Sequence, residues 1–124
     1  INKNYKKKVI LIDRFVDSTL AYQHYGMGID KKIIEIVNRF LLKKINVSFT
    51  FLNIVSKKNL ILRLKKRKSL NRYDKFKLNF YDKVQKGYLK IAKSNPKSYK
   101  LIDSNLDQKK NEKLIKDQID KLIK

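Results

Sequence analysis

The feature that most constrains the fold is the apolar run Val9-Ile10-Leu11-Ile12, which is followed directly by Asp13 and Arg14. A short, continuous apolar run is typical of a strand buried on both faces, and such strands are found mainly in parallel sheets. In open α/β sheets, ligands bind in the crevice beyond the carboxyl ends of the strands. The acid and the arginine at the end of this predicted strand therefore indicate a binding or catalytic edge.

Apolar stripes of helical period alternate with β-branched and aromatic runs along the rest of the chain. Strands that alternate with helices favour right-handed βαβ units and a parallel sheet. We therefore expect one α/β domain over residues 1–124, whose three strands leave an edge of the sheet bare. The predicted strands are 9–12, 47–55 and 99–102; the predicted helices are 30–44 (N-cap Asp30), 56–64 (N-cap Ser56), 78–94 (ended by Asn95-Pro96) and 107 onward, and 13–28 is a predicted loop with at most a short helical piece at 18–23.

The net charge of +21 raises the possibility of nucleic-acid binding, because a strongly positive protein attracts polyanions. However, most of the 32 basic residues are lysine, whereas bidentate phosphate recognition favours arginine. Lys, Asn and Ile, which are abundant here, have A/T-rich codons, so a biased genome accounts for the lysine excess. We expect no specific nucleic-acid partner, and a small basic nucleic-acid-binding protein remains the alternative from another function class.

Several kinds of site are excluded by composition. The chain has no cysteine, which excludes disulfides and thiolate chemistry, and its single histidine, His24, excludes a histidine cluster. No apolar run approaches the roughly 20 residues of a membrane span, and no signal peptide is visible. We therefore expect a cytoplasmic protein with no membrane partner.

The segment from Asp13 to Gln23 reads Asp-Arg-Phe-Val-Asp-Ser-Thr-Leu-Ala-Tyr-Gln. Short hydroxyl donors, an aromatic ring and an amide suit a pocket for a base and a sugar, because an amide carries both a donor and an acceptor. Taken alone, the Asp13–Arg14 pair is better explained by a salt bridge at a strand end. The whole string, however, closely resembles the signature of thymidylate kinases, which transfer phosphate from ATP to dTMP.

This resemblance implies a dTMP pocket built on the segment. Arg14 would contact the dTMP phosphate, and Thr19 with Gln23 would hydrogen-bond the thymine edge. Tyr22 would pack near the deoxyribose and disfavour a 2′-hydroxyl, and Ser18 would lie in the same pocket. A site built on hydrogen bonds rejects substrates that leave its polar groups unpaired.

Three of the five arginines lie at Arg63, Arg67 and Arg72, shortly before Asp74. A basic helix end that runs into a solvated loop would explain this cluster without any function. The stretch at about 65–77 nevertheless resembles the lid of thymidylate kinases, which carries the catalytic arginine. The resemblance implies that Arg67 and Arg72 are catalytic, that Arg63 anchors the base of the lid, and that Asp74 belongs to the lid.

The phosphate-binding motif Gly-x-x-x-x-Gly-Lys-(Ser/Thr) does not occur in the sequence. Thymidylate kinases carry it upstream of the Asp-Arg segment, so the resemblance implies a partial P-loop nucleotide-kinase fold, the C-terminal part of such an enzyme. We expect these 124 residues alone to be inactive, because ATP cannot be positioned without that cradle. The expected partners are dTMP, ATP as phosphate donor, and a second copy in a homodimer of the full-length enzyme.

The resemblance also implies Mg²⁺, with Asp13 as a water-mediated ligand. Another nucleoside or nucleotide kinase of the same fold remains an alternative, because a fold does not fix its substrate. The base preference of the pocket distinguishes these two kinases.

Overall fold

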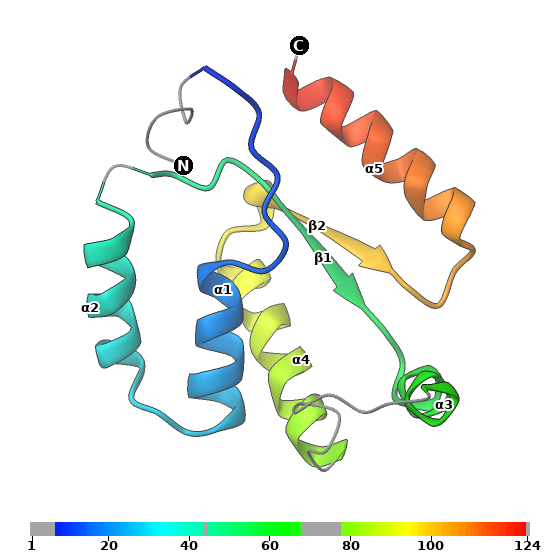
Figure 1. The fold of residues 1–124 in the computed structure, drawn as a ribbon, viewed down its shortest axis with the longest axis horizontal. Helices are drawn as coiled ribbons and strands as arrows, with labels where there is room; N and C mark the ends of the chain where they lie inside the picture. Colours follow the sequence, from blue (N-terminus) through cyan, green and yellow to red (C-terminus); the bar gives the residue numbers. More distant parts are fainter. Residues whose placement is uncertain (1–6, 44, 68–77, 124) are drawn as a thin grey trace.

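The computed structural model describes residues 7–43, 45–67 and 78–123. Most of the described residues form helices, and two short strands lie near the centre of the molecule (Figure 1). The elements in order are helix α1 (Val16–Thr19), the π-helix η1 (Leu20–Gly26), helix α2 (Lys31–Leu41), strand β1 (Thr50–Ile54), helix α3 (Lys57–Lys66), helix α4 (Leu78–Ser94), the 3₁₀ turn η3 (Pro96–Ser98), strand β2 (Tyr99–Asp103) and helix α5 (Gln108–Ile123).

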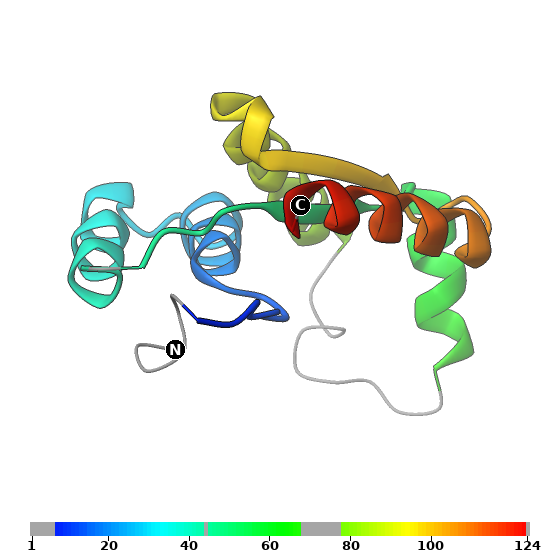
Figure 2. The same cartoon turned by 90° about the horizontal axis from the view of Figure 1, so that it is seen from above.

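The sheet is parallel, as the sequence predicts. Strands β1 and β2 pair in register from Thr50 opposite Tyr99 to Ile54 opposite Asp103, and the crossover between them contains α3 and α4. Two views at right angles place α2 and α5 on opposite sides of the molecule, with the sheet between them (Figure 2). The predicted α/β class is therefore confirmed.

The core lies where η1 packs against α4 and where α4 meets β1. Among the described residues, the buried side chains are all aliphatic, which is the usual composition of a small core. They are Ala21, Ile34, Leu52, Val84, Ala92 and Ile102. The core thus fixes η1, the end of the predicted signature segment, relative to the strands.

Two glycines allow η1 and α4 to approach closely. A Cβ on Gly26 would lie 2.6 Å from the ring of Phe80, and a Cβ on Gly87 would lie 2.6 Å from the ring of Tyr25. Neither distance leaves room for a methyl group. Gly26 is therefore a packing residue, whereas Gly28, which has a φ of +81° and open space around it, serves the turn that follows η1.

Both predicted helix caps are present. The Asp30 side chain accepts a 2.8 Å hydrogen bond from the N–H of Lys32, and the Ser56 hydroxyl accepts one of 3.3 Å from the N–H of Asn59. Each bond satisfies a backbone donor that the first turn of a helix leaves free. Helix α4 ends before Asn95 and Pro96, as expected.

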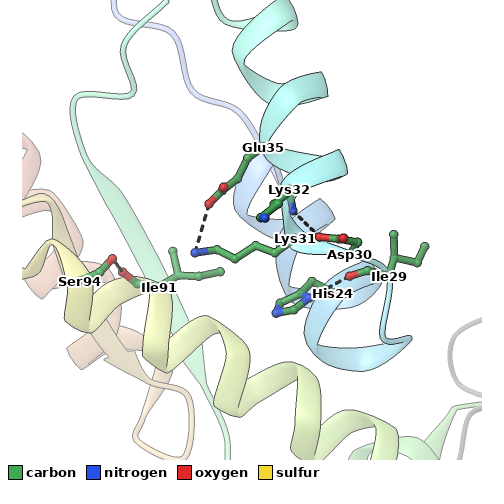
Figure 3. Close-up of polar contacts among 8 residues, drawn as sticks. All are labelled: His24, Ile29, Asp30, Lys31, Lys32, Glu35, Ile91 and Ser94. Carbon is green, nitrogen blue, oxygen red and sulfur yellow. Dashed lines mark hydrogen bonds and ion pairs between the residues drawn. The ribbon is translucent and has the colours of Figure 1, made fainter.

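The turn from η1 into α2 is held by polar contacts (Figure 3). Nδ1 of His24 lies 2.8 Å from the carbonyl oxygen of Ile29, so this nitrogen must carry the proton. Within α2, Nζ of Lys31 lies 3.1 Å from Oε1 of Glu35, one turn later. His24 therefore has a local structural role in this turn.

The prediction of an interior strand over Val9–Ile12 is wrong. None of these four residues belongs to a strand, and Leu11 is 80% exposed. A strand forms only where a neighbouring backbone supplies its ladder hydrogen bonds. Within the described residues, β1 and β2 pair only with each other, so the apolar run has no ladder to join.

Within the predicted loop 13–28, the helical piece expected at 18–23 at most is longer than predicted, because residues 16–26 form α1 and η1 without a break. The cause is tertiary, because packing against α4 buries Ala21 and brings Gly26 onto Phe80. The predicted second strand is shorter than expected, since β1 covers Thr50–Ile54 rather than 47–55. Most of the predicted lid falls on 68–77, outside the described residues.

Candidate functional site

A cavity of about 140 Å³ opens at the carboxyl end of β1, between that strand, α3 and α4. This is the position at which open α/β sheets bind ligands. Its walls combine aromatic rings with polar side chains. The lining residues are Tyr22, Asn53, Ile54, Val55, Lys57, Leu60, Tyr81, Asp82, Val84, Gln85 and Tyr88. Of the five predicted substrate-binding residues, only Tyr22 lines it directly.

Arg14 reaches this cavity through Tyr22. Its guanidinium carbon lies 4.5 Å from the centre of the Tyr22 ring, a cation–π geometry that orients the cation over the ring face. Arg14 also has a φ of +63°, in the left-handed region that side-chain-bearing residues seldom adopt. Such backbone conformations concentrate at functional sites, where the surrounding structure maintains them.

Ser18 joins the same cluster through Tyr88 of α4. The Ser18 and Tyr88 hydroxyl oxygens lie 2.6 Å apart, and Nε of Arg14 donates a longer bond of 3.5 Å to the Ser18 oxygen. Burial raises the pKa of Tyr88, an effect larger than the opposing one of its bond to Ser18, so the phenol keeps its proton at neutral pH. The Tyr22 and Tyr88 rings meet edge to face at 6.4 Å.

A second tyrosine secures the same helix from the sheet side. The hydroxyl of Tyr99, at the start of β2, donates a 2.7 Å hydrogen bond to Oδ2 of Asp17. Burial and this bond together raise the pKa of Tyr99 well above its ordinary value of 10.0. The two neighbouring residues Asp17 and Ser18 are thus fixed by tyrosines from two different elements.

Thr19 and Gln23 lie four positions apart, across the junction of α1 and η1. Thr19 is half-buried and Gln23 is exposed. Neither lines the cavity, and their predicted contacts with a base remain a prediction. Gln23 lies in a π-helix. Helices of this kind are rare in proteins, and those that occur are often at functional sites.

The predicted anchor of the lid, Arg63, donates from its guanidinium to the carbonyl oxygen of Ser104, in the turn after β2. In the same turn, Oδ1 of Asn105 accepts from the N–H of Ser56 at 3.0 Å and from Nδ2 of Asn59 at 2.9 Å. These bonds tie the start of α3 to the turn that follows the neighbouring strand.

Arg67, a predicted catalytic residue, is the exposed C-cap of α3. The other predicted catalytic arginine, Arg72, and the lid residue Asp74 lie outside the described residues. The predicted catalytic roles are therefore still predictions.

The fit of Mg²⁺ can be judged from the acidic side chains. Among residues 7–43, 45–67 and 78–123, no three His, Cys, Asp or Glu side chains gather in a way that could hold a metal. Asp13 is exposed, and Asp17 is engaged by Tyr99. In nucleotide sites Mg²⁺ takes one or two carboxylates and fills its shell with phosphate oxygens and water. Asp13 can therefore supply one ligand at most, and these residues do not form a magnesium site by themselves.

Sequence reasoning missed most of the cavity wall. The Gln85 side chain accepts a 3.0 Å bond from the N–H of Val55, and Lys57 forms a 3.1 Å ion pair with Asp82 across the opening. Tyr88 lies four residues from both Val84 and Ala92, a spacing that by itself indicates an ordinary core position on the predicted helix. The signal that could have distinguished it is its hydroxyl, because a buried phenol needs a polar partner.

No helix in the part of the chain that the structure describes is long and apolar enough to cross a membrane.

Comparison with known proteins gives one consistent result. The profile of the family described as thymidylate kinase matches residues 1–115. The thymidylate kinase of Wolbachia pipientis wMel is 32% identical over 115 residues, which are 93% of this chain and 56% of the relative. That of Mycoplasma capricolum subsp. capricolum is 38% identical over 104 residues, which are 82% of this chain and 49% of the relative.

A solved structure, the thymidylate kinase from Ehrlichia chaffeensis, matches with a TM-score of 0.58 and 30% identity, over 90% of this chain and 50% of that one. The chain thus spans about half the length of the curated relatives that it matches.

Proposed function

Because this chain belongs to the thymidylate kinase family, we propose that it forms the dTMP-binding and lid-bearing part of an enzyme that converts ATP and dTMP to ADP and dTDP. The family and the fold support a role in nucleotide phosphoryl transfer. The choice of dTMP as acceptor is our proposal. It rests on the segment from Asp13 to Gln23 and on how its side chains are arranged.

The observation that carries the proposal is the Arg14 guanidinium stacked on Tyr22 at the edge of the cavity. A nucleoside monophosphate has its phosphate one bond from C5′ of the sugar, so its site needs a phosphate-binding cation beside a surface for the sugar. Arg14 supplies the cation, and guanidinium suits phosphate because it donates two parallel hydrogen bonds. Tyr22 supplies the adjacent surface.

We assign recognition of the thymine edge to Thr19 and Gln23, which are separated by about one helical turn. An amide can pair with the neighbouring donor and acceptor of a pyrimidine edge. This assignment makes base recognition a property of η1 and its junction with α1, while phosphate recognition belongs to the loop before α1.

The reaction requires little covalent chemistry from the protein. An oxygen of the dTMP phosphate attacks the γ-phosphorus of ATP, and ADP leaves with the electron pair of the broken bond. Catalysis comes from alignment and from positive charge on the transferring group. We assign the positive charge to Arg67 and Arg72, and Mg²⁺ bound to ATP would supply further charge to the phosphates.

We also propose that the enzyme is a homodimer that uses the outer face of α2. Five apolar residues of this helix are between 49% and 67% exposed, whereas a monomer seldom exposes large apolar patches. They are Ile33, Ile36, Val37, Phe40 and Leu41. A second copy would remove this surface from water.

The proposed reaction is tested by assaying dTDP formation from ATP and dTMP. The 124-residue chain alone should form none, because it lacks the Gly-x-x-x-x-Gly-Lys-(Ser/Thr) cradle. The same chain, completed with the part of the Wolbachia relative that it does not match, should form dTDP, and the Arg14→Ala variant of this fusion should lose at least about tenfold in kcat/KM. A folded fusion that phosphorylates no nucleotide, or dTDP formation by the chain alone, would contradict the proposal.

A further inference from the structure

We propose that Tyr88 is a positioning residue that holds the Arg14 guanidinium in place for the substrate phosphate. This inference rests on the proposed dTMP site and adds a residue to it. Tyr88 would not touch the phosphate itself. It would act through Ser18 and Tyr22, two side chains that contact Arg14, because it contacts both of them.

The first connection runs through Ser18. The Tyr88 and Ser18 hydroxyls form the shortest polar contact of the cluster, at 2.6 Å, and the Ser18 oxygen accepts from Nε of Arg14 at 3.5 Å. A free serine hydroxyl rotates among several orientations. The contact with Tyr88 restricts the Ser18 side chain, and whichever hydroxyl donates in it, the Ser18 oxygen keeps a lone pair with which to accept from the guanidinium.

The second connection runs through Tyr22. Its ring lies under the Arg14 guanidinium at 4.5 Å and meets the edge of Tyr88 at 6.4 Å. Phe80, two turns before Tyr88 on α4, meets the same ring edge to face, with the ring centres 5.8 Å apart. The aromatic edges from α4 thus fix the plane on which the cation stacks.

Tyr88 is suited to this role because its own position is well determined. It lies one turn after the buried Val84 and one turn before the buried Ala92, on a 17-residue helix. Arg14, in contrast, is an exposed side chain on a loop residue. A long side chain loses rotamer freedom when it binds, so contacts that order it beforehand strengthen phosphate binding.

The test separates phosphate binding from binding in general. Calorimetric titration of the chain with dTMP and with thymidine gives an affinity ratio that reports the contribution of the phosphate. In Tyr88→Phe, which removes one hydroxyl, dTMP affinity should fall by about three- to tenfold, as expected for one lost hydrogen bond, while thymidine affinity changes by less than about twofold.

The matched control is Ser94→Ala. It removes a hydroxyl of the same helix, α4, that bonds only locally to the carbonyl oxygen of Ile91 and does not line the cavity. It should leave the ratio of dTMP to thymidine affinity unchanged. Ser18→Ala should reproduce the effect of Tyr88→Phe, and the double variant should be no worse than either single one, because both break the same connection.

The possible failures are distinguishable. If the unmodified chain binds dTMP no more tightly than thymidine, the proposed phosphate site and this inference both fail. If it prefers dTMP and Tyr88→Phe keeps that preference, or weakens both ligands equally, only the positioning role is overturned. Circular dichroism of each variant confirms that a change in affinity does not come from unfolding.

Discussion

The phenol of Tyr99 donates a 2.7 Å hydrogen bond to Oδ2 of Asp17, and so joins the first residue of β2 to α1 across 82 positions of the sequence. Asp17 directly precedes Ser18, which the phenol of Tyr88 holds. The short helix that carries the proposed phosphate-binding cluster is therefore positioned both by the sheet and by α4. Its four residues form too short a helix to be stable by themselves.

The Tyr99 bond predicts a loss of stability at alkaline pH. Burial and the Asp17 carboxylate raise the pKa of Tyr99 above its ordinary 10.0, so above that pH the unfolded chain loses the phenol proton more readily than the folded one. The contribution of the bond to the free energy of unfolding is fully present below pH 10 and falls as the pH rises beyond it. Urea titrations at pH 7 to 11 should show this decline.

Tyr99→Phe is the control for that experiment. The variant should be less stable at pH 7 by about 0.5–1.5 kcal/mol, the usual net value of a hydrogen bond. The difference in stability between the two proteins should narrow above pH 10. A constant difference up to pH 11 would contradict the assigned role of the phenol, because lysine titration affects both proteins alike.

Gly87→Ala should be destabilising, although alanine favours helices. Its Cβ would lie 2.6 Å from Cδ2 of Tyr25, so η1 must move away from α4. Overpacking costs about 1–3 kcal/mol, against a gain of about 1 kcal/mol in helix propensity. Thermal unfolding should therefore show a lower Tm, whereas Lys86→Ala, at an exposed position of the same helix, should leave it nearly unchanged. An increased Tm in Gly87→Ala would show that the two elements are not in close contact.

Asn105→Ala should loosen α3. The Asn105 amide oxygen accepts from the N–H of Ser56 and from Nδ2 of Asn59, so its loss removes two bonds at the start of the helix, worth about 1–3 kcal/mol together. Hydrogen–deuterium exchange should accelerate over Lys57–Lys66. Asn95→Ala, which removes a local bond to Ser98, should leave that exchange rate unaltered. Equal exchange in both variants would contradict the anchoring of α3 by this turn.

The α2 surface predicts self-association. If a second copy covers it, Phe40→Glu should shift the chain from dimer to monomer in sedimentation equilibrium, because Phe40 is 67% exposed and central to the apolar face. Leu106→Glu, at an exposed position in the turn before α5, serves as the control. A chain that is monomeric at every concentration before substitution would exclude the proposed interface.

Base recognition is tested by Thr19→Ala and Gln23→Ala. Each should reduce the preference for dTMP over dCMP by at least about tenfold. A hydrogen-bonding site discriminates against a ligand that cannot pair with the polar groups of the site. Competition binding measures this ratio. Asn38→Ala, a substitution on α2 away from the cavity, should retain the preference. If both pocket variants keep the unmodified ratio, the thymine edge is recognised elsewhere.

The sequence predicts the elements that depend on local signals. Both N-caps, the stop at Pro96 and the parallel pairing of β1 with β2 follow from capping residues, proline geometry and the alternation of strands with helices along the chain. It fails over Val9–Ile12, because strand formation depends on a partner that an apolar run does not specify.

Prediction of the site divides in the same way. Arg14, Ser18 and Tyr22 follow one another at intervals of four residues in one segment, and the structure brings all three together. Tyr88 and Tyr99 join them from more than 60 residues away, and their spacing matches that of ordinary core positions. A contact that depends on how η1 crosses α4 cannot be inferred from periodicity alone.

The most direct test of the central claim is equilibrium binding of dTMP, dCMP and UMP to the 124-residue chain, measured by calorimetry at fixed ionic strength. We predict saturable binding with dTMP preferred over both of the other nucleotides, and an affinity that Arg14→Ala weakens. Equal affinities for the three nucleotides that fall together with increasing salt would indicate general attraction of anions to a chain of charge +21, and would contradict a dTMP pocket.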